Sequence, residues 1–382
     1  MTIYLDHAAT TPVHPDVIQT MLPIYTHSYG NASSTHSAGR EARSVVQRAR
    51  DLMASLLGCA ATQLVFTSGG TESNNMAILG AAAARSSLGK HIITVQTEHH
   101  AVLHTCQHLE KLGYEITYLD VDNNGRIDLK QLEEVIRPET ILISVMYGNN
   151  EVGTIQPIVK IGELARSKGI WFHVDAVQAL GVIELSLSSL PIDLMSFSAH
   201  KIQGPKGIGA LYIAKHIQLE PILHGGSQER KRRAGTENVP GIAGFSKALQ
   251  IFIEHRYEMQ QKMEKLRIEM VTRLQKQLGS EQVVINGHPT DYLPHILNIS
   301  FPGISSETML MSLDMEGIAA ASGSACTSGS LEVSHVLQAM KLSEQVTASA
   351  VRFSFGSASS LQDIVTCAEK IVTIVNRIRN NY

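Results

Sequence analysis

The alternation of short apolar runs with longer helical patterns is the feature that most constrains the fold of this chain. Several of the short runs are rich in β-branched residues and apolar on both faces, as strands buried inside a parallel sheet are. The expected strands span residues 91–97, 115–120, 141–146, 171–175, 194–198 and 209–213. The expected helices span residues 71–87, 101–112, 129–136 and 158–167. This order predicts an α/β fold with a doubly wound, mostly parallel sheet.

The length and composition of the chain allow a second, smaller domain. The chain has 382 residues, 43% of them hydrophobic, which is enough for two domains. From about residue 241 to 276 the pattern stays helical and is richer in charged residues and Met, and shorter strand patterns follow at 295–301 and 352–355. We expect one long helix to lead from a large domain, residues 15–255, into a small α+β domain, residues 256–382 together with residues 1–14.

The charge and cysteine content argue against several classes of function. The formal net charge is −3, and the densest basic run, residues 230–233, lies between two glycine motifs, so direct nucleic-acid binding is not expected. No segment approaches the roughly 20 apolar residues that cross a bilayer, and the first residues do not resemble a signal peptide, so we expect a cytoplasmic protein without membrane contact. The four cysteines are widely separated and include no C-x-x-C pair, which indicates neither a disulfide framework nor a thiolate metal site.

A lysine between an apolar run and a Gly/Pro-rich turn is the first candidate for chemistry. Residues 198–207 read SAHKIQGPKG, with Lys201 at the fourth position, and Asp175 lies 26 positions upstream of this lysine. A lysine that forms a Schiff base must be held where its amine can lose a proton, and pyridoxal phosphate (PLP) also needs a carboxylate that keeps its ring nitrogen protonated. Lys201 and Asp175 are therefore the candidates for binding this cofactor.

A glycine-rich segment that opens a helix is the candidate phosphate site. Residues 67–74, TSGGTESN, follow an apolar run and begin a helical pattern. Glycines would let backbone N–H groups converge on an anion, and the helix N-terminus would add partial positive charge. The alternative of equal weight is a plain helix cap after a glycine turn.

The surroundings of Cys326 distinguish it from the other cysteines. It lies in a run of small residues, 320–330, AASGSACTSGS, which predicts an exposed thiol that can reach two places. A surface cysteine without function is the alternative, and the sequence pattern does not decide between the two. Cys59, Cys106 and Cys367 lie in or near helical patterns and are expected in the core.

The histidines near residue 100 admit two interpretations. His100, His104 and His108 share one helical face, a spacing that can hold a metal ion. No carboxylate signature accompanies them, so we favour a solvated polar stripe and expect no metal site. His99 lies between the expected strand and helix, where an imidazole can stack on a flat ring and move a proton.

Together these motifs resemble those of the NifS/IscS-like cysteine desulfurases of group I, which are PLP-dependent members of the class-V aminotransferase family. The similarity extends from Tyr4 to about Arg352. It is carried by segments 4–12, 68–74, 97–102, 148–153, 173–178, 198–201, 225–229, 233–238 and 322–327. The resemblance implies the aspartate aminotransferase-like fold of PLP-dependent transferases (fold type I) and a homodimer with shared active sites.

The resemblance also implies a role for each matching residue. Lys201 would form a Schiff base with PLP, Asp175 would pair with the ring nitrogen, and His99 would stack on the ring. Gln178 and Asn150 would lie near the ring hydroxyl, and Arg352, together with Asn150, would bind the substrate carboxylate. The phosphate would be bound by four residues of one subunit, Gly70, Thr71, Ser198 and His200. Thr236 of the partner subunit would complete this phosphate site.

The implied reaction converts L-cysteine into L-alanine and leaves its sulfur on Cys326 as a persulfide. His99 is the candidate acceptor for the thiol proton of Cys326. The sulfur would then pass to an acceptor protein, either a tRNA 2-thiouridylase or an iron–sulfur scaffold protein. A transaminase or lyase on the same fold is the alternative; it would keep Lys201 and Asp175 but would not need Cys326.

Overall fold

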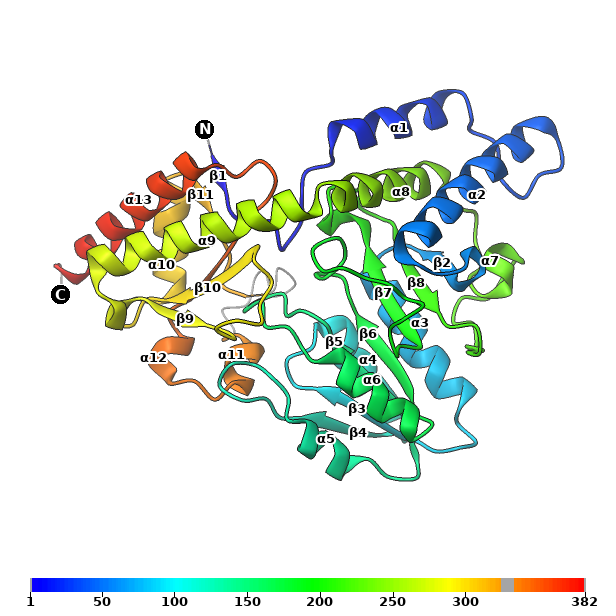
Figure 1. Cartoon of the computed structure of the whole chain (residues 1–382), viewed down its shortest axis with the longest axis horizontal. Helices are drawn as coiled ribbons and strands as arrows, with labels where there is room; N and C mark the ends of the chain where they lie inside the picture. Colours follow the sequence, from blue (N-terminus) through cyan, green and yellow to red (C-terminus); the bar gives the residue numbers. More distant parts are fainter. Residues whose placement is uncertain (1, 324–332, 381–382) are drawn as a thin grey trace.

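The computed structural model describes residues 2–323 and 333–380, and its centre is a seven-stranded mixed sheet of order β2-β8-β7-β6-β5-β3-β4 (Figure 1). The strands are β2 (Leu64–Thr67), β3 (His91–Val95), β4 (Glu115–Leu119), β5 (Thr140–Met146), β6 (Trp171–Asp175), β7 (Leu194–Ser198) and β8 (Gly209–Ile213). All neighbours from β7 to β4 pair in parallel, whereas β8 is antiparallel to both β7 and β2. The predicted mostly parallel sheet and its six predicted strands are confirmed; the periodicity does not predict the short β2.

Helices cover both faces of this sheet. In Figure 1, α3 (Gly70–Ala84) and α4 (His100–Lys111) lie behind it, whereas α6 (Ile158–Ser167) lies in front. α5 (Leu129–Val135) packs against α6 and β4. These four helices are the ones that the sequence predicts between strands. The remaining helical segments of this part are α1 (Pro15–Thr26), α2 (Ser37–Leu57), η1 (Ala61–Gln63), η2 (Ala199–Lys201), α7 (Gln228–Lys231) and α8 (Val239–Glu254).

A smaller α+β part follows. Its three-stranded antiparallel sheet has the order β12-β10-β9, with β9 (Val284–Asn286), β10 (Ile296–Ser300) and β12 (Ala350–Ser354). The N-terminus joins this part, because β1 (Ile3–Tyr4) pairs in parallel with β11 (Ile318–Ala319). Its helical segments are α9 (Arg256–Leu278), η3 (Ser280–Gln282), α10 (Ser306–Met315), α11 (His335–Ala339), α12 (Glu344–Thr347) and α13 (Leu361–Arg379).

Each of these two parts has its own cluster of buried apolar side chains. The first surrounds the seven-stranded sheet and ends along the chain at Phe252 of α8, apart from a few later residues such as Val336. The second fills the space between α9, α13 and the three-stranded sheet, and it includes Leu5. This division supports our proposal of a large domain, 15–255, and a small domain, 256–382 with 1–14.

The junction between the two parts differs from the single long helix that the sequence predicts. The structure has two helices, α8 and α9, with His255 between them at φ −105° and ψ 9°. The buried side chains of α8 belong to the first apolar cluster, whereas those of α9 belong to the second. A break at His255 lets each helix turn its apolar stripe toward its own cluster, which one straight helix would not do.

None of the helices in the described part of the chain combines the length and the apolar character that a membrane crossing requires.

A hydrogen-bonded histidine lies inside the sheet. His173, on β6, is fully buried, and its ring nitrogens contact the hydroxyls of Ser144 on β5 (2.8 Å) and Ser196 on β7 (2.9 Å). Burial lowers the pKa of His173 to about 3, so the ring is neutral at physiological pH. In the unfolded chain this histidine has an ordinary pKa near 6.5. Between about pH 3 and pH 6.5, His173 therefore binds a proton in the unfolded chain but not in the folded protein.

We therefore expect His173 to make the protein less stable as the pH falls below about 6.5. The free energy of unfolding should fall when the pH is lowered from 7 to 5. This fall should be about 2 kcal/mol smaller in His173→Gln than in the wild type. Chemical denaturation at both pH values measures this difference. His108→Gln, which changes an exposed histidine on α4, should keep the wild-type dependence. An unchanged pH dependence in His173→Gln would contradict the explanation.

Candidate active site

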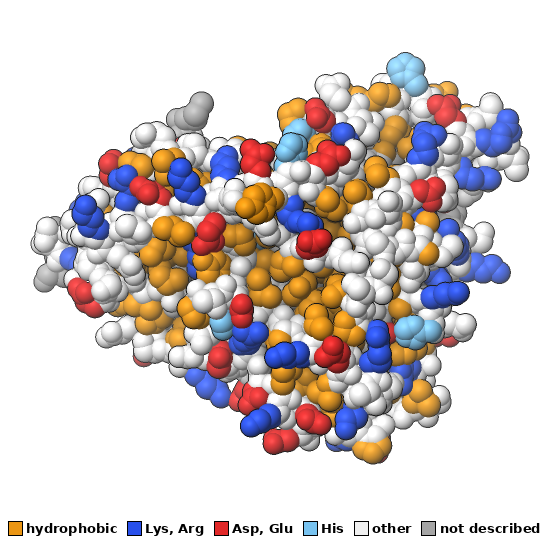
Figure 2. Space-filling view, in the orientation of Figure 1, with side chains coloured by type: hydrophobic (Ala, Val, Ile, Leu, Met, Phe, Trp, Pro, Cys, Tyr) orange, Lys and Arg blue, Asp and Glu red, His pale blue; other side chains and the backbone are white. Residues whose placement is uncertain are grey.

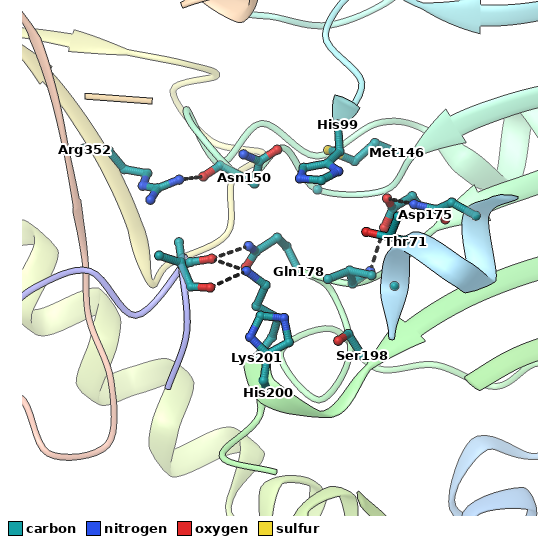
Figure 3. A pocket seen from close by; sticks show the side chains of 16 residues that line it. Thr71, His99, Met146, Asn150, Asp175, Gln178, Ser198, His200, Lys201 and Arg352 are labelled. Atoms are coloured by element: carbon teal, nitrogen blue, oxygen red, sulfur yellow. Dashed lines mark hydrogen bonds between the residues drawn. The ribbon is translucent and has the colours of Figure 1, made fainter. Parts of the chain in front are cut away.

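Ten of the predicted site residues line one cavity of about 180 Å³ (Figure 3). They are Gly70, Thr71, His99, Asn150, Asp175, Gln178, Ser198, His200, Lys201 and Arg352. The last residues of β5, β6 and β7, which are Met146, Asp175 and Ser198, all reach the cavity. Ligands of open α/β sheets bind outside these carboxyl ends of parallel strands. Two predicted residues are not among those that line this cavity: Thr236 lines a different pocket, and Cys326 lies outside the described residues.

Lys201 is held at the cavity by backbone carbonyls. It ends the helical turn η2 that directly follows β7, and its Nζ donates hydrogen bonds to the carbonyl oxygens of Ala8 (2.6 Å) and Ala9 (2.8 Å). The Gln178 amide also donates to the Ala8 carbonyl, at 2.9 Å. The N-terminal segment thus passes along the cavity and orients two of its polar side chains, as Figure 3 shows.

Asp175 presents a buried carboxyl group to the cavity. Its carboxylate accepts hydrogen bonds from the Asn74 side-chain amide (2.6 Å) and from the Val177 N–H (3.0 Å). Burial raises the pKa of Asp175, and these two donors together with the charge of Lys201 act against that rise. A cation that entered the cavity beside Asp175 would favour the ionised form of this carboxyl group. The ionised form is the one that would pair with a protonated ring nitrogen of PLP.

The N-terminus of α3 faces the cavity and supplies donors for an anion. The N–H groups of the first helical turn have no acceptor inside a helix, and Gly70 and Thr71 begin this turn. A Cβ atom at Gly70 would lie 2.7 Å from Cγ2 of Val177, so only glycine fits against that side chain. The Cβ atom of Ser198 lies 3.6 Å from the same position.

The two histidines of the cavity are neutral. Burial is the main cause that lowers the pKa of His99 to about 4 and that of His200 to about 3, and the charge of Lys201 contributes to both. His99 is the N-cap residue of α4, and its Nδ1 accepts the Ala101 N–H at 3.1 Å. The ring proton of neutral His99 therefore lies on Nε2. Nδ1 of His200 lies 3.2 Å from the Thr10 hydroxyl.

Arg352 reaches the cavity from the smaller part of the molecule. It lies on β12, and its side chain is buried. Its Nη1 donates to the Asn150 carbonyl (2.9 Å), and its Nη2 donates to Oδ1 of Asp6 (2.8 Å). A guanidinium at this place can bind a carboxylate with two hydrogen bonds.

Sequence reasoning missed the remaining six residues that line the cavity: Ala8, Ala9, Asn74, Met146, Gly148 and Val177. Asn74 could have been found, because it lies one helical turn after Gly70 and Thr71 on the same face of the predicted helix. Ala8 and Ala9 act through their carbonyl groups, which every residue has, so their side chains carry no signal.

Thr236 is exposed and lies in the segment 225–238 that follows the sheet. Glu229, Arg230 and Lys231 in this segment have positive φ angles of 45°, 57° and 65°, which non-glycine residues rarely adopt. A buried ion pair holds this conformation, because Arg50 donates to both carboxylate oxygens of Glu229. Figure 2 shows Lys and Arg side chains gathered at the edge where α7 of this segment lies.

The remaining histidines and cysteines among the described residues do not line this cavity. The rings of His100 and His104 lie 5.0 Å apart, but no group of three or more His, Cys, Asp or Glu side chains within residues 2–323 and 333–380 is arranged to hold a metal ion. Cys106 and Cys367 are buried, as predicted, and burial raises the pKa of each to about 12. Cys59 is partly buried, with a pKa raised to about 11.

Comparison with known proteins identifies the family. Residues 3–366 match the family described as aminotransferase class-V. A Bacillus subtilis (strain 168) protein named putative cysteine desulfurase IscS 1 is 50% identical over 378 residues, which are 98% of this chain and 99% of that protein. A solved structure titled NifS-like protein has a TM-score of 0.93 at 37% identity, over 99% of this chain and 100% of that one. A solved structure titled SspA in complex with cysteine has a TM-score of 0.81 at 36% identity, over 93% of this chain and 99% of that one.

The matches extend over nearly the whole chain, so they include both the part with the seven-stranded sheet and the smaller α+β part. The chain belongs to the class-V aminotransferase family and, within it, to the IscS/NifS-like cysteine desulfurases.

Proposed function

We propose that this protein removes the sulfur of L-cysteine and releases L-alanine, with PLP as its cofactor and Cys326 as the first sulfur acceptor. The observation that carries this proposal is the convergence of Lys201, Asp175 and Arg352 on one cavity at the N-terminus of α3. A relative of this chain was solved in complex with cysteine, which supports the same substrate here.

The residues of the cavity fit PLP. The buried Asp175 carboxylate suits a protonated ring nitrogen, and the donors at Gly70 and Thr71, with Ser198 and His200, suit a phosphate. Gln178 and Asn150 would be near the ring hydroxyl, His99 would cover the ring, and Nζ of Lys201 is the amine that would react with the cofactor aldehyde. When bound, PLP would withdraw electrons from Cα of the substrate, so that its proton becomes acidic.

The side chains of the cavity then have separate tasks. Arg352 would bind the substrate carboxylate through N–H groups that do not contact Asp6 or Asn150. The substrate amine would take the place of Nζ of Lys201 at the cofactor. Nζ would then be available to accept the Cα proton and return it, which a lysine can do once it has lost its own proton.

Sulfur transfer requires a thiolate and a group that holds its proton. In the proposed step the C–S bond of the substrate breaks and an S–S bond to Cys326 forms, so the sulfur is oxidised and the carbon is reduced without another reagent. His99 is the proposed proton acceptor; it would take the proton on Nδ1 in place of the hydrogen bond from the Ala101 N–H, because Nε2 already carries the ring proton. Its low pKa arises in part from the charge of Lys201, so loss of that charge would make His99 more basic.

The partners of the protein are also part of this proposal. We infer a homodimer in which Thr236 of the partner subunit completes the phosphate site. Thr236 is exposed and does not line the cavity of its own subunit, which supports that assignment. The persulfide sulfur would pass to an acceptor protein, a tRNA 2-thiouridylase or an iron–sulfur scaffold protein.

The identity of the nucleophile can be tested with Cys326→Ala. This variant should bind PLP, with visible absorbance like that of the wild type, but should release neither alanine nor sulfide from L-cysteine and dithiothreitol, because no thiolate receives the sulfur. Lys201→Ala should lose both the visible absorbance of the lysine-bound cofactor and the activity.

Cys59→Ser is the matched control, since this cysteine does not line the cavity, and it should retain wild-type turnover. A turnover in Cys326→Ala equal to that of the wild type would refute the persulfide mechanism and favour a lyase or transaminase.

The proposed phosphate site at Gly70 and Thr71 can be tested with Gly70→Ala. The added Cβ would press against Val177 and displace the N-terminus of α3, so the affinity for PLP should fall at least about tenfold, or about 1.4 kcal/mol. Titration of the cofactor-free protein with PLP, followed by visible absorbance, measures this loss. The double variant Gly70→Ala/Val177→Ala should recover most of the affinity, because the contacted methyl group is gone. Equal PLP affinities of Gly70→Ala and wild type would show that the phosphate does not bind at Gly70.

A further inference from the structure

Arg352 is a buried cation whose orientation depends on a few partners. Its side chain is 1% exposed, so water does not hold the guanidinium in place. One N–H group contacts the Asn150 carbonyl and another contacts Oδ1 of Asp6. The Nε atom has no hydrogen-bond partner among the described residues. A guanidinium has five N–H donors, so enough remain for a carboxylate ligand.

Asp6 contacts this guanidinium from outside the cavity. Arg352 and Asn150 both line the cavity, whereas Asp6 is absent from the described residues that line it. The side chain of Asp6 is 20% exposed, and its Oδ1 lies 2.8 Å from Nη2. A carboxylate ligand in the cavity would therefore approach the guanidinium without occupying the place of Asp6.

The backbone around Asp6 is fixed to the same strand that carries Arg352. Ser354, two residues after Arg352, donates its N–H to the Leu5 carbonyl (2.7 Å), accepts the His7 N–H with its carbonyl (3.3 Å) and accepts the Ala8 N–H with its hydroxyl (2.8 Å). Asp6 therefore cannot move away without breaking these bonds. The ion pair between Asp6 and Arg352 is built into the junction of β12 with the N-terminal segment.

We propose that Asp6 is a positioning residue for substrate binding. It fixes the Arg352 guanidinium by accepting a hydrogen bond from Nη2, so that the remaining N–H groups face the substrate carboxylate. This proposal rests on the proposed function, because it concerns the group that recognises an amino-acid substrate. The opposite role, in which Asp6 competes with the substrate carboxylate for Arg352, predicts tighter substrate binding once Asp6 is removed.

The test compares two ligands of the PLP-loaded protein by isothermal titration calorimetry. L-Alanine has the carboxylate that Arg352 would bind, and ethylamine is the same amine without it. In Asp6→Ala, the Kd of L-alanine should rise at least about tenfold, equivalent to about 1.4 kcal/mol, while the Kd of ethylamine stays within about twofold. Asp6→Asn keeps an oxygen that can accept from Nη2, so it should stay within about threefold of the wild type for both ligands.

A control variant separates this effect from the general loss of an ion pair. Asp120→Asn removes the charge of the exposed pair with Lys341 and should change neither Kd. Equal weakening of both ligands in Asp6→Ala would indicate a structural role, and tighter binding of L-alanine would indicate competition; either result overturns the proposal. If Asp6→Ala does not fold, a tenfold loss of L-alanine binding in Asp6→Asn would also overturn it, because the retained oxygen should position Arg352.

The proposed function has its own criterion, which is alanine release from L-cysteine by the wild-type protein. The calorimetric comparison does not use that reaction. An inactive wild type that still prefers L-alanine to ethylamine, and loses this preference in Asp6→Ala, would refute the sulfur chemistry and support the role of Asp6.

Discussion

The burial of charge is the constraint on which the architecture of the site depends. Asp175 and Arg352 are almost completely buried, and Lys201 is partly buried beside them. A charge at such depth is stable only when it has hydrogen-bond partners or an opposite charge. The N-terminal segment 5–11 provides the partners of Lys201 and one partner of Arg352, through two carbonyl groups and one carboxylate. A stretch that is nearly without secondary structure is therefore as important for the site as the central sheet.

The same segment ties the two parts of the molecule together. Leu5 packs in the apolar cluster of the smaller part, and Ala8, three residues later, packs in that of the larger part. A second connection crosses between the parts where Arg352 contacts the Asn150 carbonyl. These contacts set the separation between the proposed carboxylate-binding arginine and Lys201. A substrate that is held at both its carboxylate and its amine needs this separation to be fixed in advance.

Much of the fold was predictable because buried strands and amphipathic helices have clear periodicities. Six strands of the large sheet and the four helices between them follow from these patterns. The break at His255 was not predictable, because the helical pattern is continuous there and the cause is the change from one apolar cluster to the other. Most of the cavity was also predictable, since its polar side chains occur in characteristic motifs. Asp6 belongs to one of these motifs, but nothing local indicates that it pairs with an arginine 346 positions away.

The sequence by itself determined six strands of the large sheet and the four helices between them, the family, and which side chains carry chemical groups suited to a PLP enzyme. The tertiary structure decided which of these groups are neutral, which are paired and which backbone atoms act as partners. His99 is one example, because its lowered pKa and its proton on Nε2 depend on burial, on Lys201 and on the Ala101 N–H. The carbonyls of Ala8 and Ala9 are another. Both depend on the distances between groups far apart in the chain and on the exclusion of water, and these arise only when the chain is packed.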